Sequence, residues 1–250
     1  MTLQLAISPD VNVRNITDWF IFNTKIQHIT GEPVQATVYD DFADLHAAFN
    51  DGRADLVFAT AANTATLVRD KGFLPLAAPE GIANEAAIVV AEESPWKEIT
   101  DLGDRVTVAA TDAPDVERIC RILLEPADLT PESVDLEVKP NPILVAKAVL
   151  RQQADIGFLP REAYDELSQL VRRQLRVLIS SKIYVVRHSL LVSPALADKI
   201  DLLWSGLEAM NNEPGDRELL AALGAPNGWQ RLAQEETEFM IDLMEALGQD

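Results

Sequence analysis

The side chains best suited to hold a small molecule stand directly after short apolar runs of this chain. Such runs are typical of buried strands, and the loops that follow parallel strands meet at one edge of a sheet, where ligands bind. The polar residues of these loops are our candidate ligand-binding residues: Ser8, Asp10, Tyr39, Thr60, Thr111, Asp112 and Arg161. Their hydroxyl, carboxylate and guanidinium groups predict recognition of a small polar molecule.

Asp112 determines which ligand charge its loop can accept. A carboxylate about 4 Å from an oxyanion costs roughly 4 kcal/mol at an effective dielectric of 20. A helix N-terminus stabilises an anion by only about 0.3–1 kcal/mol. If Asp112 faces the ligand, the ligand is therefore neutral or cationic. If Asp112 instead caps the helix that follows, Thr111, the helix N–H groups and Arg161 can still hold an anion.

Other candidates also have structural alternatives. Tyr39 either lines the ligand site or packs beneath the acidic loop that follows it. Thr60 either donates to a ligand or is solvated in its loop. Trp19 lies on the apolar stripe of its expected helix, whereas Phe20 lies off it and is the better candidate for an aromatic wall.

The cysteine and the histidines indicate structural roles. Cys120 lies on the apolar face of an expected helix, where a buried thiol acts as a small hydrophobe. His28, His46 and His188 lack metal-ligand spacing. We therefore predict no metal site and no cofactor. None of the usual hydrolase, metalloprotease or nucleotide-binding motifs is present, so we do not expect an enzyme.

Apolar runs alternate with helical stretches along most of the chain, which is typical of parallel α/β sheets. Strands are expected at residues 3–7, 34–39, 56–59, 73–78, 86–91, 106–109, 134–138, 156–159, 175–180 and 183–186. Helices are expected at residues 15–29, 42–50, 63–71, 115–125, 143–151 and 162–171, and the chain is expected to be helical from Pro194 to its end.

Two segments 100 residues apart share a pattern and predict two similar lobes. LHAAFNDGRADLVFA at 45–59 and VAKAVLRQQADIGFL at 145–159 each read as a helix, a polar turn, Ala-Asp and a buried strand. We therefore expect two doubly wound α/β lobes joined by a hinge. Residues 1–82 with 188–250 form the first lobe and residues 83–187 the second. The ligand cleft is expected between the lobes, which would close on a solute as a clamp.

Net charge and hydropathy exclude several classes of function. The formal charge of −19 argues against nucleic acid, which requires clustered Lys and Arg. No apolar run is long enough to cross a membrane, so no membrane insertion is expected. The amino terminus shows neither a basic region nor a long apolar region, so we expect no secretory leader in this sequence. We thus expect a cytoplasmic protein if Met1 is the native start, and a periplasmic one if a leader has been removed.

Long stretches of the chain resemble the phosphonate/phosphite-binding proteins of ABC importers. The resemblance rests on GRADLVF, LVRDKGFLPLAAPEG and AAIVVAEESPWKEITDLGDRVTVAATD, and on PILVAKAVLRQQADIGFL and the stretch from LLVSPALADKIDLLWSGL to LLAALG. It covers most of residues 3–247. It implies the type II periplasmic-binding-protein fold, a small-molecule ligand and an ABC permease as partner. We also expect the protein to be a monomer.

The ligand loops depart from the pattern of that family. A Ser/Thr-rich loop there grips phosphonate oxygens, but the matching loop here, at 110–115, keeps one hydroxyl, that of Thr111. An acidic residue follows the strand that matches 156–159 in the family, whereas this chain has Arg161. The position of Tyr39 matches a ligand-contacting tyrosine. The resemblance thus implies a solute-binding protein whose ligand differs from phosphonate.

Three other functions are compatible with these residues. An enzyme on the same fold, similar to the cytosolic enzymes of the futalosine route to menaquinone, requires a catalytic group with a perturbed pKa. A cytoplasmic ligand sensor requires the same clamp without a permease. A protein-interaction module with a degenerate cleft predicts no response to any small molecule.

Overall fold

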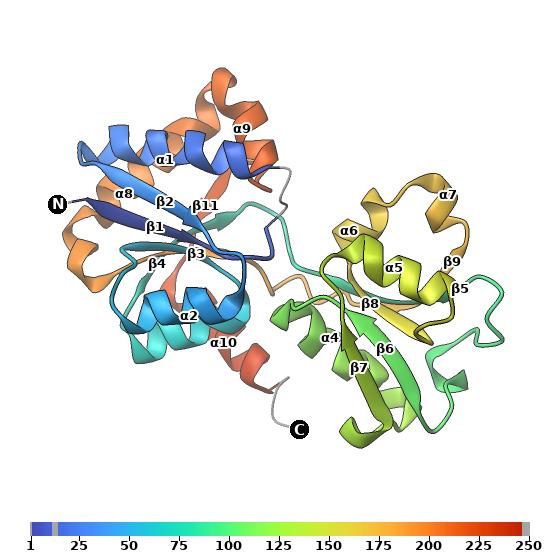
Figure 1. Ribbon diagram of the computed structural model, residues 1–250. Helices are drawn as coiled ribbons and strands as arrows, with labels where there is room; N and C mark the ends of the chain where they lie inside the picture. The colour runs from blue at the N-terminus through green and yellow to red at the C-terminus, as the bar shows by residue number, and fades with distance from the viewer. Residues whose placement is uncertain (1, 12–14, 247–250) are drawn as a thin grey trace. The chain divides into compact units, whose positions relative to one another are not determined.

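The computed structural model describes residues 2–11 and 15–246, which divide into two compact units (Figure 1). The first unit comprises the residues up to Ala83 together with Arg187–Leu243. The second comprises Asn84–Val186 and the residues from Met244 onward. Each unit contains one mixed sheet with helices on both faces (Figure 1).

The sheet of the first unit has the strand order β11-β4-β10-β3-β1-β2. Its strands are β1 (Leu3–Ile7), β2 (Val34–Val38), β3 (Leu56–Ala59), β4 (Leu74–Pro79), β10 (Ser189–Val192) and β11 (Trp229–Arg231). Strand β1 pairs in parallel with β2 and β3, whereas β10 is antiparallel to both β3 and β4. Apolar runs such as the fully buried β3 form central strands because both of their faces are covered.

The helices of the first unit are α1 (Ile16–Thr30), α2 (Phe42–Asn50), α3 (Ala61–Ala65), the π-helical turn η2 (Thr66–Asp70), η6 (Pro194–Lys199), α8 (Ile200–Asn212), η7 (Pro214–Asp216), α9 (Arg217–Ala222) and α10 (Gln234–Ala246). Helices α1, α8 and α9 cover one face of the sheet, and α2 and α10 the other (Figure 1). Trp19 is 1% exposed and Phe20 50%, which confirms the predicted apolar stripe of α1.

The sheet of the second unit has the strand order β7-β6-β8-β5-β9. Its strands are β5 (Ala86–Ala91), β6 (Val106–Ala110), β7 (Val134–Val138), β8 (Ile156–Pro160) and β9 (Leu175–Ser180). Its helices are η3 (Ile99–Asp101), α4 (Pro114–Leu124), η4 (Glu125–Ala127), η5 (Pro131–Ser133), α5 (Pro142–Leu150), α6 (Arg161–Glu166) and α7 (Gln169–Arg172). Strand β5 runs antiparallel to both of its neighbours.

The repeated sequence pattern has a physical basis in both sheets. Segment 45–59 contains most of α2 and all of β3, and segment 145–159 contains most of α5 and of β8. The carboxylate of Asp55 accepts from the backbone N–H of Gln4 at 2.8 Å, and that of Asp155 accepts from the N–H of Thr107 at 2.8 Å. The shared Ala-Asp therefore fastens the start of each strand to its neighbour in the sheet.

Two expectations about secondary structure are wrong. Residues 183–186 do not form a strand, because the N–H groups of Ile183 and Tyr184 donate to the side chain of Glu85 instead of to a neighbouring strand. The region after Pro194 is not wholly helical, because β11 pairs there with the edge strand β4. A strand of three residues is too short to show a periodicity in the sequence.

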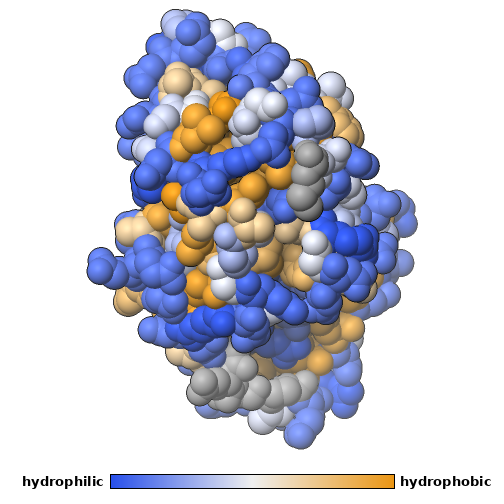
Figure 2. Space-filling model, turned by 90° about the vertical axis from the view of Figure 1, so that its left-hand side faces the viewer, coloured by the Kyte–Doolittle hydropathy of each residue, from blue (hydrophilic) through white to orange (hydrophobic). Residues whose placement is uncertain are grey.

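Polar residues cover most of the face that Figure 2 displays, with apolar residues between them. Large apolar side chains exposed in the first unit are Phe20, Ile21, Leu202 and Phe239. Exposed apolar side chains of this kind are normal on protein surfaces. Among the described residues, no helix combines the length and the hydropathy that a membrane crossing demands.

Candidate ligand-binding site

We use the term carboxyl edge for the side of each sheet at which its parallel strands end. In the first unit, β1, β2 and β3 end there, and Ser8, Tyr39 and Thr60 follow within one residue of these strands. Strand β10 runs in the opposite direction, with Ser189 paired to Ala59. The residue before β10, His188, is therefore brought to the same edge.

Ser8, Asp10 and His188 form a hydrogen-bonded group that we call the Asp10 cluster. The hydroxyl of Ser8 donates to Oδ1 of Asp10 at 2.6 Å, and Nε2 of His188 lies 3.1 Å from the same oxygen. Ser8 is fully buried, whereas the side chains of Asp10 and His188 are 15% and 17% exposed. The imidazole stacks on Phe58, with ring centroids 5.1 Å apart and planes at 13°.

Asp10 is the negative centre of this cluster. Burial raises the pKa of the Asp10 carboxyl, but the charge of His188 and the hydrogen bonds from His188 and Ser8 outweigh burial, so the pKa lies below its usual value. The Ser8 hydroxyl and the imidazole of His188 therefore share one oxygen of this carboxylate.

Tyr39 and Thr60 also make contacts within the first unit. The N–H of Tyr39 donates to the carbonyl of Ile7 at 3.1 Å, and its half-buried side chain packs against the apolar cluster beneath α2. Thr60 is fully buried at the N-cap of α3, where its hydroxyl accepts from the N–H of Asn63 at 3.2 Å. Both residues have structural roles, and their contact with a ligand stays a prediction.

In the second unit, the loop after β6 leads into α4. Thr111 is half-buried and Asp112 is exposed. Ala113 occupies the N-cap position of α4, without a side-chain hydrogen bond to the helix. The alternative in which Asp112 caps this helix is therefore wrong.

A buried carboxylate lies in the first turn of α4. Asp115 is 2% exposed, and its Oδ2 accepts from the side-chain amide of Asn84 at 3.2 Å. The N-terminal turn of a helix stabilises negative charge through its free N–H groups and its dipole. The first turn of α4 thus contains a buried carboxyl group supplied by the chain itself.

The side chain of Arg161, at the start of α6, makes its contacts within its own helix. Its guanidinium pairs with Asp165 at 3.0 Å and lies over the ring of Tyr164, 5.6 Å from the centroid. The hydrogen bond to Asp165 raises the pKa of Arg161 above its ordinary value. Its backbone N–H donates to the carbonyl of Glu85 at 2.7 Å.

The sequence reasoning did not select Glu85 or His188 as site residues. The carboxylate of Glu85 accepts from the hydroxyl of Ser181 and from the N–H groups of Ile183 and Tyr184, at 2.8 and 2.7 Å for the two amides. These partners lie 96 to 99 residues away along the chain, and Asp10 lies 178 residues from His188. No local pattern indicates contacts over such separations.

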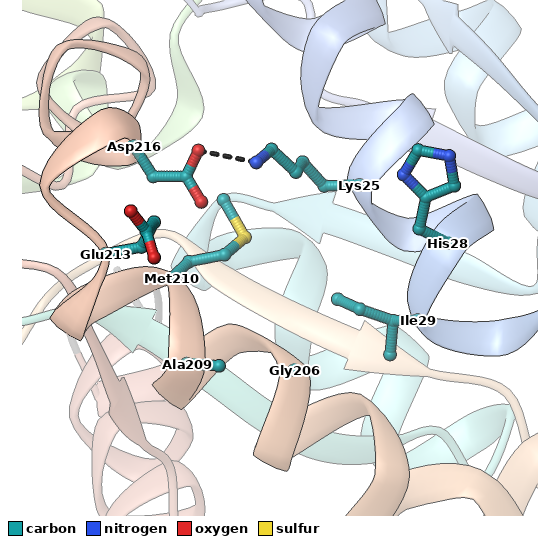
Figure 3. A pocket seen from close by; sticks show the side chains of 8 residues that line it. All are labelled: Lys25, His28, Ile29, Gly206, Ala209, Met210, Glu213 and Asp216. Atoms are coloured by element: carbon teal, nitrogen blue, oxygen red, sulfur yellow. Dashed lines mark ion pairs between the residues drawn. The ribbon is translucent and has the colours of Figure 1, made fainter.

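A groove of about 320 Å³ lies between α1 and α8 (Figure 3). Its lining residues are Lys25, His28, Ile29, Gly206, Ala209, Met210, Glu213 and Asp216. Lys25 and Asp216 neutralise each other at 2.6 Å across its upper end (Figure 3). A Cβ on Gly206 would lie 2.4 Å from Ile29, so the two helices approach closely there. The groove is explained as the packing seam of these helices.

Comparisons with solved structures show the fold. PhnD1 from Prochlorococcus marinus in complex with methylphosphonate has a TM-score of 0.83 and 10% identity, covering 100% of this chain and 99% of that one. XAC2383 from Xanthomonas citri bound to ATP has a TM-score of 0.78 and 16% identity over 99% and 97%. The aliphatic sulphonate-binding protein SsuA from Escherichia coli has a TM-score of 0.69 and 14% identity over 99% and 91%.

None of the curated proteins matches this chain. The family model of the phosphonate-type periplasmic substrate-binding protein of ABC transporters matches residues 5–236. The predicted two-lobed type II fold and the predicted solute-binding function are confirmed. The chain therefore belongs to the family of phosphonate-type substrate-binding proteins of ABC transporters.

Proposed function

We propose that this chain binds a neutral or cationic solute in place of a phosphonate. One observation carries the proposal: the carboxylate of Asp112 in the loop before α4 is exposed and does not cap the helix. The resemblance described above implies that members of the family grip phosphonate oxygens at this helix end. We propose that Asp112 faces the place that the phosphonate oxygens would take in such a loop.

Simple electrostatics shows which effect is larger. A phosphonate oxygen about 4 Å from one carboxylate is repelled by roughly 4 kcal/mol at an effective dielectric of 20. A helix N-terminus stabilises the same anion by only about 0.3–1 kcal/mol. The one hydroxyl of the loop, on Thr111, adds a hydrogen bond worth about 1 kcal/mol. Attraction therefore does not offset repulsion for an anion, whereas an ammonium group gains from the same carboxylate.

The remaining charges at the carboxyl edges support this assignment. Arg161, the candidate cation, is paired with Asp165, and Asp10 in the first unit is held in its ionised form by His188 and Ser8. We propose that the ligand contacts are made by the predicted set: Ser8, Asp10, Tyr39, Thr60, Thr111, Asp112 and Arg161. Closure of the two predicted lobes on the ligand stays a prediction of the sequence.

We further propose that the chain is a periplasmic, monomeric carrier that delivers its solute to an ABC permease and does not transform it. The description of the family supports the place and the partner. The family's description as a substrate-binding protein supports binding without chemical conversion. Mass spectrometry of a ligand after long incubation should recover it unchanged, and a converted product would contradict this assignment.

A thermal-shift screen tests the charge of the ligand. The panel should contain methylphosphonate, phosphite and ethanesulfonate on one side, and choline, putrescine and neutral amino acids on the other. A ligand at 100 times its dissociation constant adds about 2.7 kcal/mol, which raises Tm measurably. We expect responses among cationic or neutral compounds. A strong response to methylphosphonate alone would refute the proposal.

A variant of the α4 loop sharpens this test. Asp112→Asn removes the negative charge of the loop while keeping a polar group of similar size, so affinity for methylphosphonate should rise and affinity for cations should fall. Asp104→Asn removes an exposed charge elsewhere in the second unit and is the matched control. Equal changes in the control and the loop variant would show that net charge, and not this loop, selects the ligand.

A further inference from the structure

Tyr184 has a left-handed backbone conformation, and it does not lie at the end of a helix. Among the described residues, three that are not glycine have positive φ: Asp128 at 53°, Gln152 at 55° and Tyr184 at 61°. Asp128 is the C-cap of η4, and Gln152 closes the turn after α5. Helix ends commonly finish in this left-handed conformation. Tyr184 follows a strand, and a bulky aromatic residue rarely adopts it.

The side chain of Glu85 holds this conformation in place. Its Oε1 accepts from the N–H groups of Ile183 and Tyr184 at 2.8 and 2.7 Å, and its Oε2 accepts from the hydroxyl of Ser181. Hydrogen bonds to a charged acceptor are the stronger kind. Three donors from four consecutive residues thus fix the turn around one carboxylate.

The ring of Tyr184 gains little from packing. Tyr184 is 69% exposed, so burial of its apolar surface does not compensate for the unfavourable φ. Residues kept in a strained conformation by their surroundings cluster at binding and catalytic sites. Both the strain and the exposure therefore point to a role outside the folding of the second unit.

The turn that carries Tyr184 lies at the carboxyl edge of the second sheet. It follows β9, which ends at Ser180, and Glu85 immediately precedes β5. The carbonyl of Glu85 accepts from the N–H of Arg161, the residue that follows β8. Tyr184 is therefore tied, through Glu85, to one of the candidate ligand loops.

We infer that Tyr184 is a specificity-determining residue that presents its ring to an alkylated ammonium group of the ligand, and that Glu85 is the residue that positions it. This inference rests on the proposed function, because it adds an aromatic face to a site that favours cations. Aromatic faces attract cations through the ring quadrupole, and quaternary ammonium groups are recognised in this way.

The test compares choline with its uncharged isostere 3,3-dimethylbutan-1-ol by calorimetry on the full chain. We expect the wild type to prefer choline, Tyr184→Phe to keep most of the affinity, and Tyr184→Ala to lose about 3- to 30-fold in affinity for choline. Glu85→Gln should weaken choline binding in the same direction. Leu170→Ala removes another exposed apolar side chain of this unit and should leave the affinity unchanged.

The outcomes separate this inference from the proposed function. Equal choline affinities for the wild type and Tyr184→Ala overturn the inference, and so does a wild type that responds to other cations but not to choline. In both cases the proposed function stands. A chain that responds to anions alone overturns both.

A second variant tests whether Tyr184 serves the fold instead. Tyr184→Gly accepts positive φ without strain, so the Tm of the ligand-free variant should equal or exceed that of the wild type while its response to choline disappears. Gln152→Gly, at another residue with positive φ in this unit, should leave choline binding intact. A lower Tm for Tyr184→Gly would assign the tyrosine to the fold and overturn the inference.

Discussion

Replacing Asp10 by Asn tests whether the Asp10 cluster is held by charge. The carboxylate of Asp10 accepts from Ser8 at 2.6 Å and lies 3.1 Å from Nε2 of His188. Asn is nearly isosteric and keeps one carbonyl oxygen, so both hydrogen bonds can survive in neutral form. The substitution therefore removes charge with little change in packing.

The structure gives the magnitude of the loss. A hydrogen bond to a charged group contributes about 1.5–3 kcal/mol, and a neutral one about 0.5–1.5 kcal/mol. Two bonds that change from charged to neutral thus cost roughly 2 kcal/mol in the free energy of unfolding. For a chain of this size, such a loss lowers Tm by roughly 4–8 °C. The side chains of Asp10 and His188 are 15% and 17% exposed, so solvent screens their interaction only in part.

The pH dependence follows from the lowered pKa of Asp10. A carboxyl whose pKa is lower in the folded chain stabilises the fold above its unfolded pKa, and this contribution is lost as the pH falls through the folded pKa. The ordinary value for Asp is 3.8. Wild type and Asp10→Asn should therefore differ fully at pH 5 to 7 and converge below that value.

Urea unfolding at pH 7 and pH 3, followed by circular dichroism, measures both quantities. Asp40→Asn removes an exposed carboxylate from the same unit and should change stability by less than about 0.5 kcal/mol. His188→Gln alone and together with Asp10→Asn completes a cycle, whose coupling should be at least about 0.5 kcal/mol. A loss below about 0.5 kcal/mol, or one that grows as the pH falls, would refute the role of charge.

Gly206→Ala should destabilise the chain by about 1–3 kcal/mol in urea unfolding, because its Cβ would lie 2.4 Å from a side-chain carbon of α1; Gly103→Ala, with nothing within 4 Å, should not. Cys120 is fully buried, and burial raises the pKa of its thiol, so it should resist thiol reagents until the chain unfolds. Rapid labelling of the native chain would contradict its burial. Lys25→Met leaves the buried carboxylate of Asp216 without this ion pair and should cost about 1–3 kcal/mol in unfolding free energy. An unchanged free energy would show that the ion pair contributes nothing.

Local patterns predicted the framework because their physical causes are local. Alternating apolar runs and helical stripes give the strands and helices within a few residues of their bounds, since each element buries a periodic set of side chains. The repeat around Asp55 and Asp155 was also visible, because in both places one carboxylate fastens a strand to its neighbour. The sequence also shows directly that the loop at Thr111 has fewer hydroxyl groups than the Ser/Thr-rich loop of the family.

Elements without a local signal were missed. Strand β11 has three residues, and Trp229 within it is held by the side chain of Asn211, which bonds to both its N–H and its carbonyl. Residues 183–186 have the composition of a strand, but Glu85 takes two of their N–H groups. In both cases a side chain distant in sequence decided the backbone conformation.

The sequence by itself determined the family, the two α/β repeats and the loops in which a ligand contact is expected. The tertiary structure alone decided which side chains meet. It brought His188 to Asp10, placed the buried Asp115 against Asn84, and turned Arg161 toward Asp165. The physical reason is that secondary structure depends on periodic burial along the chain. The charge of a binding site depends instead on pairs of side chains that are distant in sequence and meet only in the folded protein.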